Sequence, residues 1–218
     1  MEIPNLKYEQ KLWTAGVDFI AGVDEVGRGP LAGPFVVCAA ILDKHRINDV
    51  ILKNDFQNSV YSKINDSKAL TDKKRRDIAA ILQNELVSYS IIEISNEELD
   101  TIGISKATQK AFFAAIKNLK IKAQHIFTDL FEIKNLTKAD QTNIKGGDRI
   151  SMSVSAASIM AKVYRDDIMR NMAIKYPNYG FEKNMGYGTA QHIEAIKKHG
   201  ICEIHRLSYE PVKSMRLP

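Results

Sequence analysis

The sequence has only two cysteines, Cys38 and Cys202, among its 218 residues. Two thiols cannot form the disulfide network of small secreted domains, and they suit a reducing compartment. No apolar run approaches the roughly 20 residues of a membrane-spanning helix, because the longest covers only residues 35–42. The first dozen residues also lack the basic start and apolar middle of a secretory signal. We therefore expect a cytoplasmic protein with no membrane partner.

The charge is close to balanced, with 31 Lys and Arg against 26 Asp and Glu and a net charge of +5. This mild excess permits a polyanionic partner without demonstrating one. Apolar residues make up 44% and charged residues 26%, as in an ordinary globular chain. The length suits one domain. We expect residues 1–218 to form a single domain, with residues 176–218 as a helical C-terminal part packed on it.

The hydrophobic periodicity alternates between strands and helices. Strands are predicted at residues 19–24, 34–42, 87–94 and 124–129. Helices are predicted to begin at Thr71 and Ser95 and to cover residues 104–119, 151–172 and 189–199. The polar segment 43–66 is expected to be mostly loop. Strands followed by helices, with two consecutive strands at the start, predict an α/β fold with a mixed sheet flanked by helices.

Carboxylates follow several of these predicted strands. Asp24 and Glu25 are adjacent at the end of the first one, and Asp129 ends the strand at residues 124–129. Asp148 follows a Gly-Gly pair. Successive side chains of a strand point to opposite faces, so Asp24 and Glu25 serve one site only if the strand finishes there and the backbone turns.

Two interpretations of these acids remain open at this point. Aspartate is common at strand ends because its side chain bonds its own backbone, and this accounts for any one of them. Several acids at strand ends without a His or Cys cluster form instead a set of hard oxygen ligands, suited to Mg²⁺ or Mn²⁺. Two such ions are sufficient for phosphoryl-transfer chemistry.

The segment Gly27-Arg28-Gly29 follows the acidic pair directly. Without a Cβ on either side, its backbone is open to close approach. Gly27, Gly29 and Gly33 after a strand suggest a dinucleotide-binding turn, but Pro30 and Pro34 interrupt the segment and a strand follows it. We exclude that interpretation.

The stretch DEVGRGPLAGP (24–34) resembles the signature of the bacterial type 2 ribonuclease H family, ribonuclease HII. Further blocks are similar to the same family in the same order across residues 18–213. They are INDSKALTDKKR (64–75), ISKATQKAFFAAI (104–116), SVSAASIMAKVYRD (153–166), YPNYGFEKNMGYGTAQH (176–192) and IHRLSYEPV (204–212). The resemblance implies a ribonuclease H-like mixed sheet with a helical C-terminal extension.

The resemblance also implies roles for individual residues. The family holds two divalent ions, Mg²⁺ or Mn²⁺, with four carboxylates, which match Asp24, Glu25, Asp129 and Asp148. The Gly-Arg-Gly turn contacts the 2′-hydroxyl at an RNA-to-DNA junction through backbone atoms, and it matches Gly27, Arg28 and Gly29. Lys68 would bind a phosphate near the site, and Tyr187 would stack on the sugar beyond the ribonucleotide. Only the 2′-hydroxyl distinguishes a ribonucleotide locally, so a close-approach turn suits that task.

The sequence departs from the family pattern at two places. The family usually has Gly after its third carboxylate, where this chain has Leu130. The loop at residues 43–65 is also longer than usual, and we assign it no function. Asp166 competes with Asp148 as the fourth carboxylate. Its place within a helix, one turn from Lys162, favours a helix-surface ion pair.

Other residues have simpler alternatives. His199, Cys202 and His205 are three residues apart, but three mixed ligands in a short loop are weak evidence for zinc, and a structural role is favoured. Tyr187 could be a packing aromatic. The basic run at residues 73–76 is interpreted as a solvated helix face that adds nonspecific attraction to nucleic acid.

The resemblance implies a metal-dependent endoribonuclease acting on RNA/DNA hybrids and on DNA that contains ribonucleotides. It would cut 5′ to a ribonucleotide and leave 3′-hydroxyl and 5′-phosphate ends, removing misplaced ribonucleotides and residual primer RNA. We expect a monomer. The alternatives are a type 3 relative that cuts longer hybrids and a noncatalytic hybrid-binding protein of the same fold. The intact Gly-Arg-Gly turn argues against the first, and the four carboxylates argue against the second.

Overall fold

The computed structural model describes residues 4–215, and the chain divides into two compact units. The first unit contains the described part of Met1–Glu25 together with Val37–Ile92 and Phe112–Val163. The second contains Val26–Val36, Glu93–Ala111 and the described part of Tyr164–Pro218. Its boundaries differ from the expected division at residue 176, because three separate stretches of chain contribute to it. That the chain is a single domain stays a prediction.

A five-stranded sheet has the strand order β3-β2-β1-β4-β5. Parallel pairing joins β1 to β4, with Ile20 opposite His125, and β4 to β5, with Asp129 opposite Ile144. The predicted sheet flanked by helices is therefore confirmed, although β5 was not predicted. The strands are β1 (Ile20–Val26), β2 (Phe35–Leu42), β3 (Leu86–Ile94), β4 (His125–Asp129) and β5 (Gln141–Ile144).

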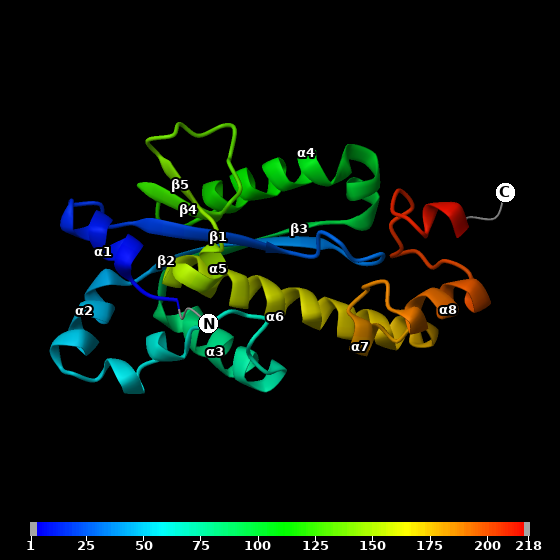
Figure 1. Cartoon of the computed structure of the whole chain (residues 1–218), viewed down its shortest axis with the longest axis horizontal. Helices are drawn as coiled ribbons and strands as arrows, with labels where there is room; N and C mark the ends of the chain where they lie inside the picture. The colour runs from blue at the N-terminus through cyan, green and yellow to red at the C-terminus, as the bar shows by residue number, and fades with distance from the viewer. Residues whose placement is uncertain (1–3, 216–218) are drawn as a thin grey trace. The chain divides into compact units, whose positions relative to one another are not determined.

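Figure 1 shows α5 and the start of α6 lying along the strands of this sheet. The approach is close at Gly22 in β1, where a Cβ would lie 2.1 Å from the backbone carbon of Ser153. Only glycine fits at position 22, because the backbone at Ser153 cannot move far enough to make room for a Cβ. All eight residues of β2 are buried, which explains why its sequence is a continuous apolar run and not an alternating one.

The predicted helices are present with small shifts at their ends. Thr71 caps α3 by accepting from the backbone N–H of Lys74, as its sequence predicts. The two expected helices after Ser95 form one element, α4, which is interrupted at Gly103 with φ of 76°. The longer helices are α1 (Lys7–Thr14), α2 (Lys44–Leu52), α3 (Asp72–Glu85), α4 (Asn96–Lys117), α6 (Met152–Lys175) and α8 (Ala190–His199), and the shorter ones are α5 (Gly147–Ile150) and α7 (Phe181–Asn184).

The prediction that residues 43–66 are mostly loop is wrong for their first half, which forms α2. The side chain of Asp43 accepts hydrogen bonds from the backbone N–H groups of His45 and Arg46, and Ile47 is buried. Asp43 is thus the N-cap of a short helix in which only Ile47 is buried. The N-terminal helix α1 was also not predicted.

The second unit has its own apolar cluster. It brings residues of the segment after β1 against residues from the C-terminal quarter of the chain: Leu31, Ala32, Met169, Tyr179, Phe181, Ile196 and Val212. The turn after β1 is therefore packed by residues more than a hundred positions away in sequence. No helix within residues 4–215 combines the length and apolarity that a membrane crossing requires.

Candidate active site

Both adjacent acids lie inside β1, which continues to Val26. The expectation that the strand ends at Asp24 is therefore wrong by two residues. Because side chains alternate along a strand, Asp24 and Glu25 leave it in opposite directions. Asp24 is only 6% exposed, whereas Glu25 is half-buried.

Asp24 lies in an environment that opposes its ionisation. Burial raises the pKa of this carboxyl well above its ordinary value, and the negative charges of Glu25 and Asp148 raise the pKa further. Hydrogen bonds from the Ser158 side chain and the Glu25 backbone act in the opposite direction but do not compensate. A bound divalent cation would offset the repulsion between Asp24 and the two neighbouring acids and the cost of burying its charge.

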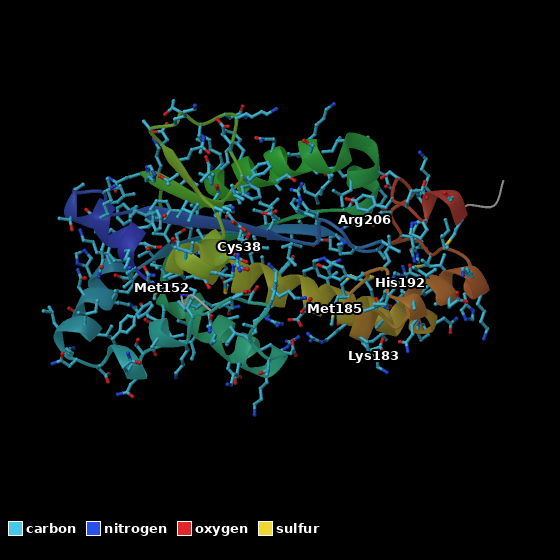
Figure 2. All side chains as sticks on the ribbon, viewed as in Figure 1. Cys38, Met152, Lys183, Met185, His192 and Arg206 are labelled. Carbon is cyan, nitrogen blue, oxygen red and sulfur yellow. The ribbon has the colours of Figure 1, made fainter. Side chains whose placement is uncertain are left out.

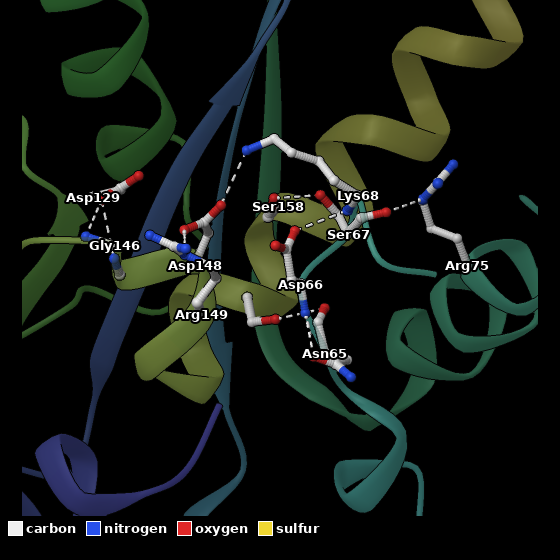
Figure 3. Close-up of polar contacts among 12 residues, drawn as sticks. Asn65, Asp66, Ser67, Lys68, Arg75, Asp129, Gly146, Asp148, Arg149 and Ser158 are labelled. Carbon is white, nitrogen blue, oxygen red and sulfur yellow. Dashed lines mark hydrogen bonds and ion pairs between the residues drawn. The ribbon is translucent and has the colours of Figure 1, made fainter. Parts of the chain in front are cut away.

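Asp148 and Lys68 face each other across the first unit's candidate site, as Figure 3 shows. The Nζ atom of Lys68 donates to Oδ2 of Asp148 over 3.1 Å. Asp148 is 5% exposed, while the Lys68 side chain is 76% exposed and can reach outward. Burial acts to lower the pKa of Lys68, but the charges of Asp148 and Asp24 outweigh it and the pKa is raised.

The loop that carries Lys68 is held by buried polar contacts visible in Figure 3. The hydroxyl groups of Ser67 and Ser158 are 2.9 Å apart. Arg75 donates from Nε to the Ser67 carbonyl over 2.8 Å and from Nη2 to the Leu70 carbonyl over 2.9 Å. Arg75 is 7% exposed, so the interpretation of residues 73–76 as a solvated face is wrong for this residue. It positions Lys68.

Asp129 ends β4, as predicted, but its Oδ1 is directed at the protein backbone. It accepts hydrogen bonds of 2.8 Å and 3.0 Å from the N–H groups of Gly146 and Gly147. These bonds fix the turn that leads into α5, where Asp148 lies in the first helical turn. Asp129 therefore positions Asp148 through the backbone and keeps a second carboxylate oxygen for other contacts.

Leu130 occupies the position where the family usually has glycine, and its φ is 58°. This left-handed conformation is unfavourable for a residue with a Cβ. The turn after Asp129 thus holds Leu130 in a conformation that glycine adopts more easily.

The residues present match the chemistry of a hard divalent ion. Asp24 and Asp148, with Glu25 and Asp129 beside them in sequence or structure, offer only oxygen ligands. Among residues 4–215, however, no three Asp, Glu, His or Cys side chains converge as a ready-made metal cage. We therefore regard Asp24, and Asp148 whose charge raises the pKa of Asp24, as the residues best placed to hold a cation.

Asp166 does not fit the surface ion pair inferred from its spacing, because it is only 3% exposed on α6. The sequence-based interpretation of Asp166 as a residue on the helix surface is therefore wrong. Asp148 is the acid whose charge acts on Asp24. This favours Asp148 as the fourth carboxylate.

In the second unit, the backbone of the Gly-Arg-Gly turn is bound by a buried arginine. Arg206 donates to the carbonyls of Gly27 and Arg28 over 2.7 Å and 3.1 Å, and Figure 2 labels its position. Arg206 was missed in the sequence because nothing local distinguishes it from a surface arginine. Arg28 and Gly29 are exposed.

Tyr187 is 42% exposed, so it is not a packing aromatic of the core. The guanidinium carbon of Arg165 lies 5.9 Å from its ring centroid. Arg165 itself is fully buried and donates to the carbonyls of Pro34, Met185 and Ala32. An exposed ring supported by a buried cation leaves a free ring surface for stacking.

Two of the three residues considered for zinc, Cys202 and His205, belong instead to a hydrogen-bonded cluster with His192. His205 contacts Cys202 at 3.1 Å and His192 at 3.1 Å, and burial raises the pKa of the Cys202 thiol to about 11. His192 Nδ1 lies 2.9 Å from the Tyr187 carbonyl, which can only accept, so this nitrogen carries the proton. Neutral His192 then accepts from His205, and His205 accepts from the Cys202 N–H over 2.9 Å.

Comparison with known proteins gives a consistent picture. The family model described as ribonuclease HII matches residues 21–212. The chain is 45% identical to the ribonuclease HII of Ligilactobacillus salivarius over 212 residues, which covers 97% of this chain and 77% of that protein. It is similar to the crystal structure of ribonuclease H2 from Pyrococcus horikoshii, with a TM-score of 0.72, 27% identity and coverage of 90% and 96% of the two chains. Bst-RNase HIII, solved in complex with Mn²⁺, shares the fold at a TM-score of 0.65 and 19% identity, with coverage of 90% of this chain and 68% of that one.

Proposed function

The chain belongs to the ribonuclease HII family and is a ribonuclease H, and from that premise we propose that it cuts 5′ to ribonucleotides joined to or embedded in DNA. As a family member it is an endonuclease for RNA/DNA hybrids. The observation that supports the finer activity is the buried Asp24, on which the charges of Glu25 and Asp148 act and which shortly precedes, in the sequence, a turn whose Arg28 and Gly29 are exposed. We expect it to act as a monomer in the cytoplasm.

The proposed chemistry is hydrolysis of a phosphodiester with 3′-hydroxyl and 5′-phosphate products. Two bound Mg²⁺ or Mn²⁺ ions would supply an activated water and stabilise the departing 3′-oxygen. Asp24, Asp129 and Asp148 would hold these ions. The resemblance to the family adds Glu25, which leaves β1 in the opposite direction from Asp24 but whose charge acts on it. The Mn²⁺ complex of the RNase HIII with the same fold supports a divalent ion of this kind.

The other residues would bind and orient the substrate. Lys68, whose side chain is largely exposed beside Asp148, would contact a phosphate oxygen next to the scissile bond. Gly27, Arg28 and Gly29 would bring backbone groups against the 2′-hydroxyl. Tyr187 would stack on the following sugar, supported by Arg165.

The test uses end-labelled duplexes with one ribonucleotide, an RNA/DNA hybrid and an all-DNA duplex, incubated with Mg²⁺ or Mn²⁺ and with Asp148→Asn as the inactive control. We expect one cut 5′ of the ribonucleotide that disappears without metal and in the variant. Cleavage of the long hybrid alone would contradict the proposal and assign the specificity of a type 3 enzyme. Binding without any cleavage would assign the noncatalytic alternative.

A further inference from the structure

One buried guanidinium binds three carbonyls of the segment that follows β1. Arg206 donates from Nε to Gly33 over 2.9 Å and from its two terminal nitrogens to Gly27 and Arg28 over 2.7 Å and 3.1 Å. It has no exposed surface. A buried guanidinium is costly unless its N–H donors are hydrogen-bonded, and here backbone carbonyls accept those hydrogen bonds.

These bonds determine where the turn directs its N–H groups. A peptide unit is planar and trans, so its C=O and N–H point in opposite directions. With the carbonyls of Gly27 and Arg28 directed at Arg206, the N–H groups of Arg28 and Gly29 point away from it. Both residues are exposed. Arg206 thereby orients the two N–H groups that a 2′-hydroxyl could accept from.

The side chain of Arg28 is committed elsewhere, since it donates to the Thr108 hydroxyl over 2.9 Å. The turn therefore presents its backbone rather than its side chain. A Cβ at Gly27 would lie 2.4 Å from the Nε atom of Arg165, and Gly27 has φ of 92°, so packing and conformation both require glycine there. At Gly29 neither reason applies, because no protein atom lies within 4 Å of the position that a Cβ would take. Packing and conformation therefore leave the backbone of Gly29 open to the approach of a ligand.

Arg206 is itself held in place. The Tyr209 hydroxyl donates to the Arg28 carbonyl over 3.0 Å, and the Tyr209 ring centroid lies 5.0 Å from the Arg206 guanidinium carbon. Asp100 accepts from the backbone N–H groups of Leu207 and Ser208 over 2.7 Å and 2.9 Å. The C-terminal segment 206–209 thus forms a rigid support for the turn.

We propose that Arg206, assisted by Tyr209, is the positioning residue for ribose discrimination: it fixes the peptide planes of the Gly-Arg-Gly turn so that two N–H groups meet the 2′-hydroxyl. This inference rests on the proposed function of the turn. It assigns to the C-terminal segment a part in substrate choice, although neither residue touches the substrate.

The experiment measures equilibrium binding without divalent ion, so that nothing is cleaved. The readout is the discrimination ratio, which is the Kd for an all-DNA duplex divided by the Kd for the same duplex with one ribonucleotide. Tyr209→Phe removes one hydroxyl, and we expect the ratio to fall roughly fivefold, the equivalent of one hydrogen bond. Arg206→Lys replaces three directed donors with one point charge, and the ratio should fall about tenfold or more. Affinity for all-DNA duplex should stay constant.

Two further variants make the outcome decisive. Tyr179→Phe is the matched control, because its hydroxyl donates to the Gly200 carbonyl over 3.0 Å, away from the turn, and its ratio should equal that of the wild type. Gly29→Ala tests the turn itself and should abolish discrimination without changing the melting temperature. If Gly29→Ala discriminates like the wild type, the proposed function of the turn fails. If Gly29→Ala loses discrimination while folded Tyr209→Phe and Arg206→Lys keep it, the role of Arg206 is refuted.

Discussion

The ammonium group of Lys68 lies 3.1 Å from Oδ2 of Asp148, and Asp24 is close enough for its charge to act on the same lysine. In this arrangement one lysine cation lies beside one buried acid and is acted on by a second. Its side chain is exposed. The contact joins the residue proposed to bind phosphate to the acids of the candidate site within the first unit.

Lys68→Met should lower kcat/KM roughly 10- to 100-fold, because one charged phosphate contact is lost at the reacting centre. The slope of log Kd against log salt should also fall by about one unit, as for any single phosphate contact. Lys138→Met is the control, since Lys138 is exposed in the segment before β5 and lies outside the basic run at residues 73–76. Equal behaviour of the two variants in the cleavage and salt titrations would show that Lys68 contacts no phosphate.

Asp148→Asn should reduce cleavage at least about 100-fold and remove the stabilisation by Mn²⁺, because a charged oxygen ligand is replaced by a neutral one. Asp166→Asn should lower the melting temperature, since the residue is buried, but its folded fraction should keep its Mn²⁺-induced shift in melting temperature. Thermal melting with and without Mn²⁺ separates the two acids. If Asp148→Asn keeps the Mn²⁺-induced shift in melting temperature and Asp166→Asn loses it, Asp166 and not Asp148 is the fourth carboxylate.

Leu130→Gly should stabilise the protein by about 0.5 kcal/mol. It relieves a left-handed backbone conformation, which costs roughly 1–2 kcal/mol for a residue with a Cβ, against a smaller entropic cost of glycine. Little packing is lost, because Leu130 is 62% exposed. Urea unfolding of Leu130→Gly and of Leu130→Ala, which keeps the strain, checks this. A less stable glycine variant would show that the Leu130 side chain contributes more than its conformation costs.

The His192–His205 pair should make the protein sensitive to acid. Burial and then the neighbouring His192 lower the pKa of His205 to about 4, and burial lowers the pKa of His192. Below the ordinary value of 6.5 the unfolded chain binds protons that the folded chain does not, so stability is lost as the pH falls from 6.5 towards 4. A proton on either ring would also place two N–H groups head to head.

The measurement compares the free energy of unfolding of the wild type and His205→Phe between pH 7 and pH 4. The difference between them should shrink on acidification by on the order of 1–3 kcal/mol, since only the wild type carries the titration of His205. Taking a difference removes the contributions of the acids, which both proteins share. His199→Gln, at an exposed histidine, should follow the wild type. A constant difference across this pH range would rule out the acid sensitivity.

Features set by neighbouring residues were predicted from the sequence. Thr71 caps α3 and Asp129 ends β4 because capping and strand termination depend on the residues next to them. The carboxylates and the Gly-Arg-Gly turn were found because residue type and spacing carry their chemistry. The limits of β1 and the helix α2 were misjudged: β1 continues to Val26, and α2 is a short helix of nine residues in which only Ile47 is buried.

By itself, the sequence determined which chemical groups are present and their order along the chain. Only the tertiary structure decided which arginines are buried and what they bind. Arg206 and Gly27 are 179 residues apart, and Lys68 and Asp148 are 80 apart. An arginine has the same local signature whether solvent or carbonyls satisfy its donors, and the choice follows from how distant segments pack. The orientation of the turn and the charge around Asp24 therefore emerge only on folding.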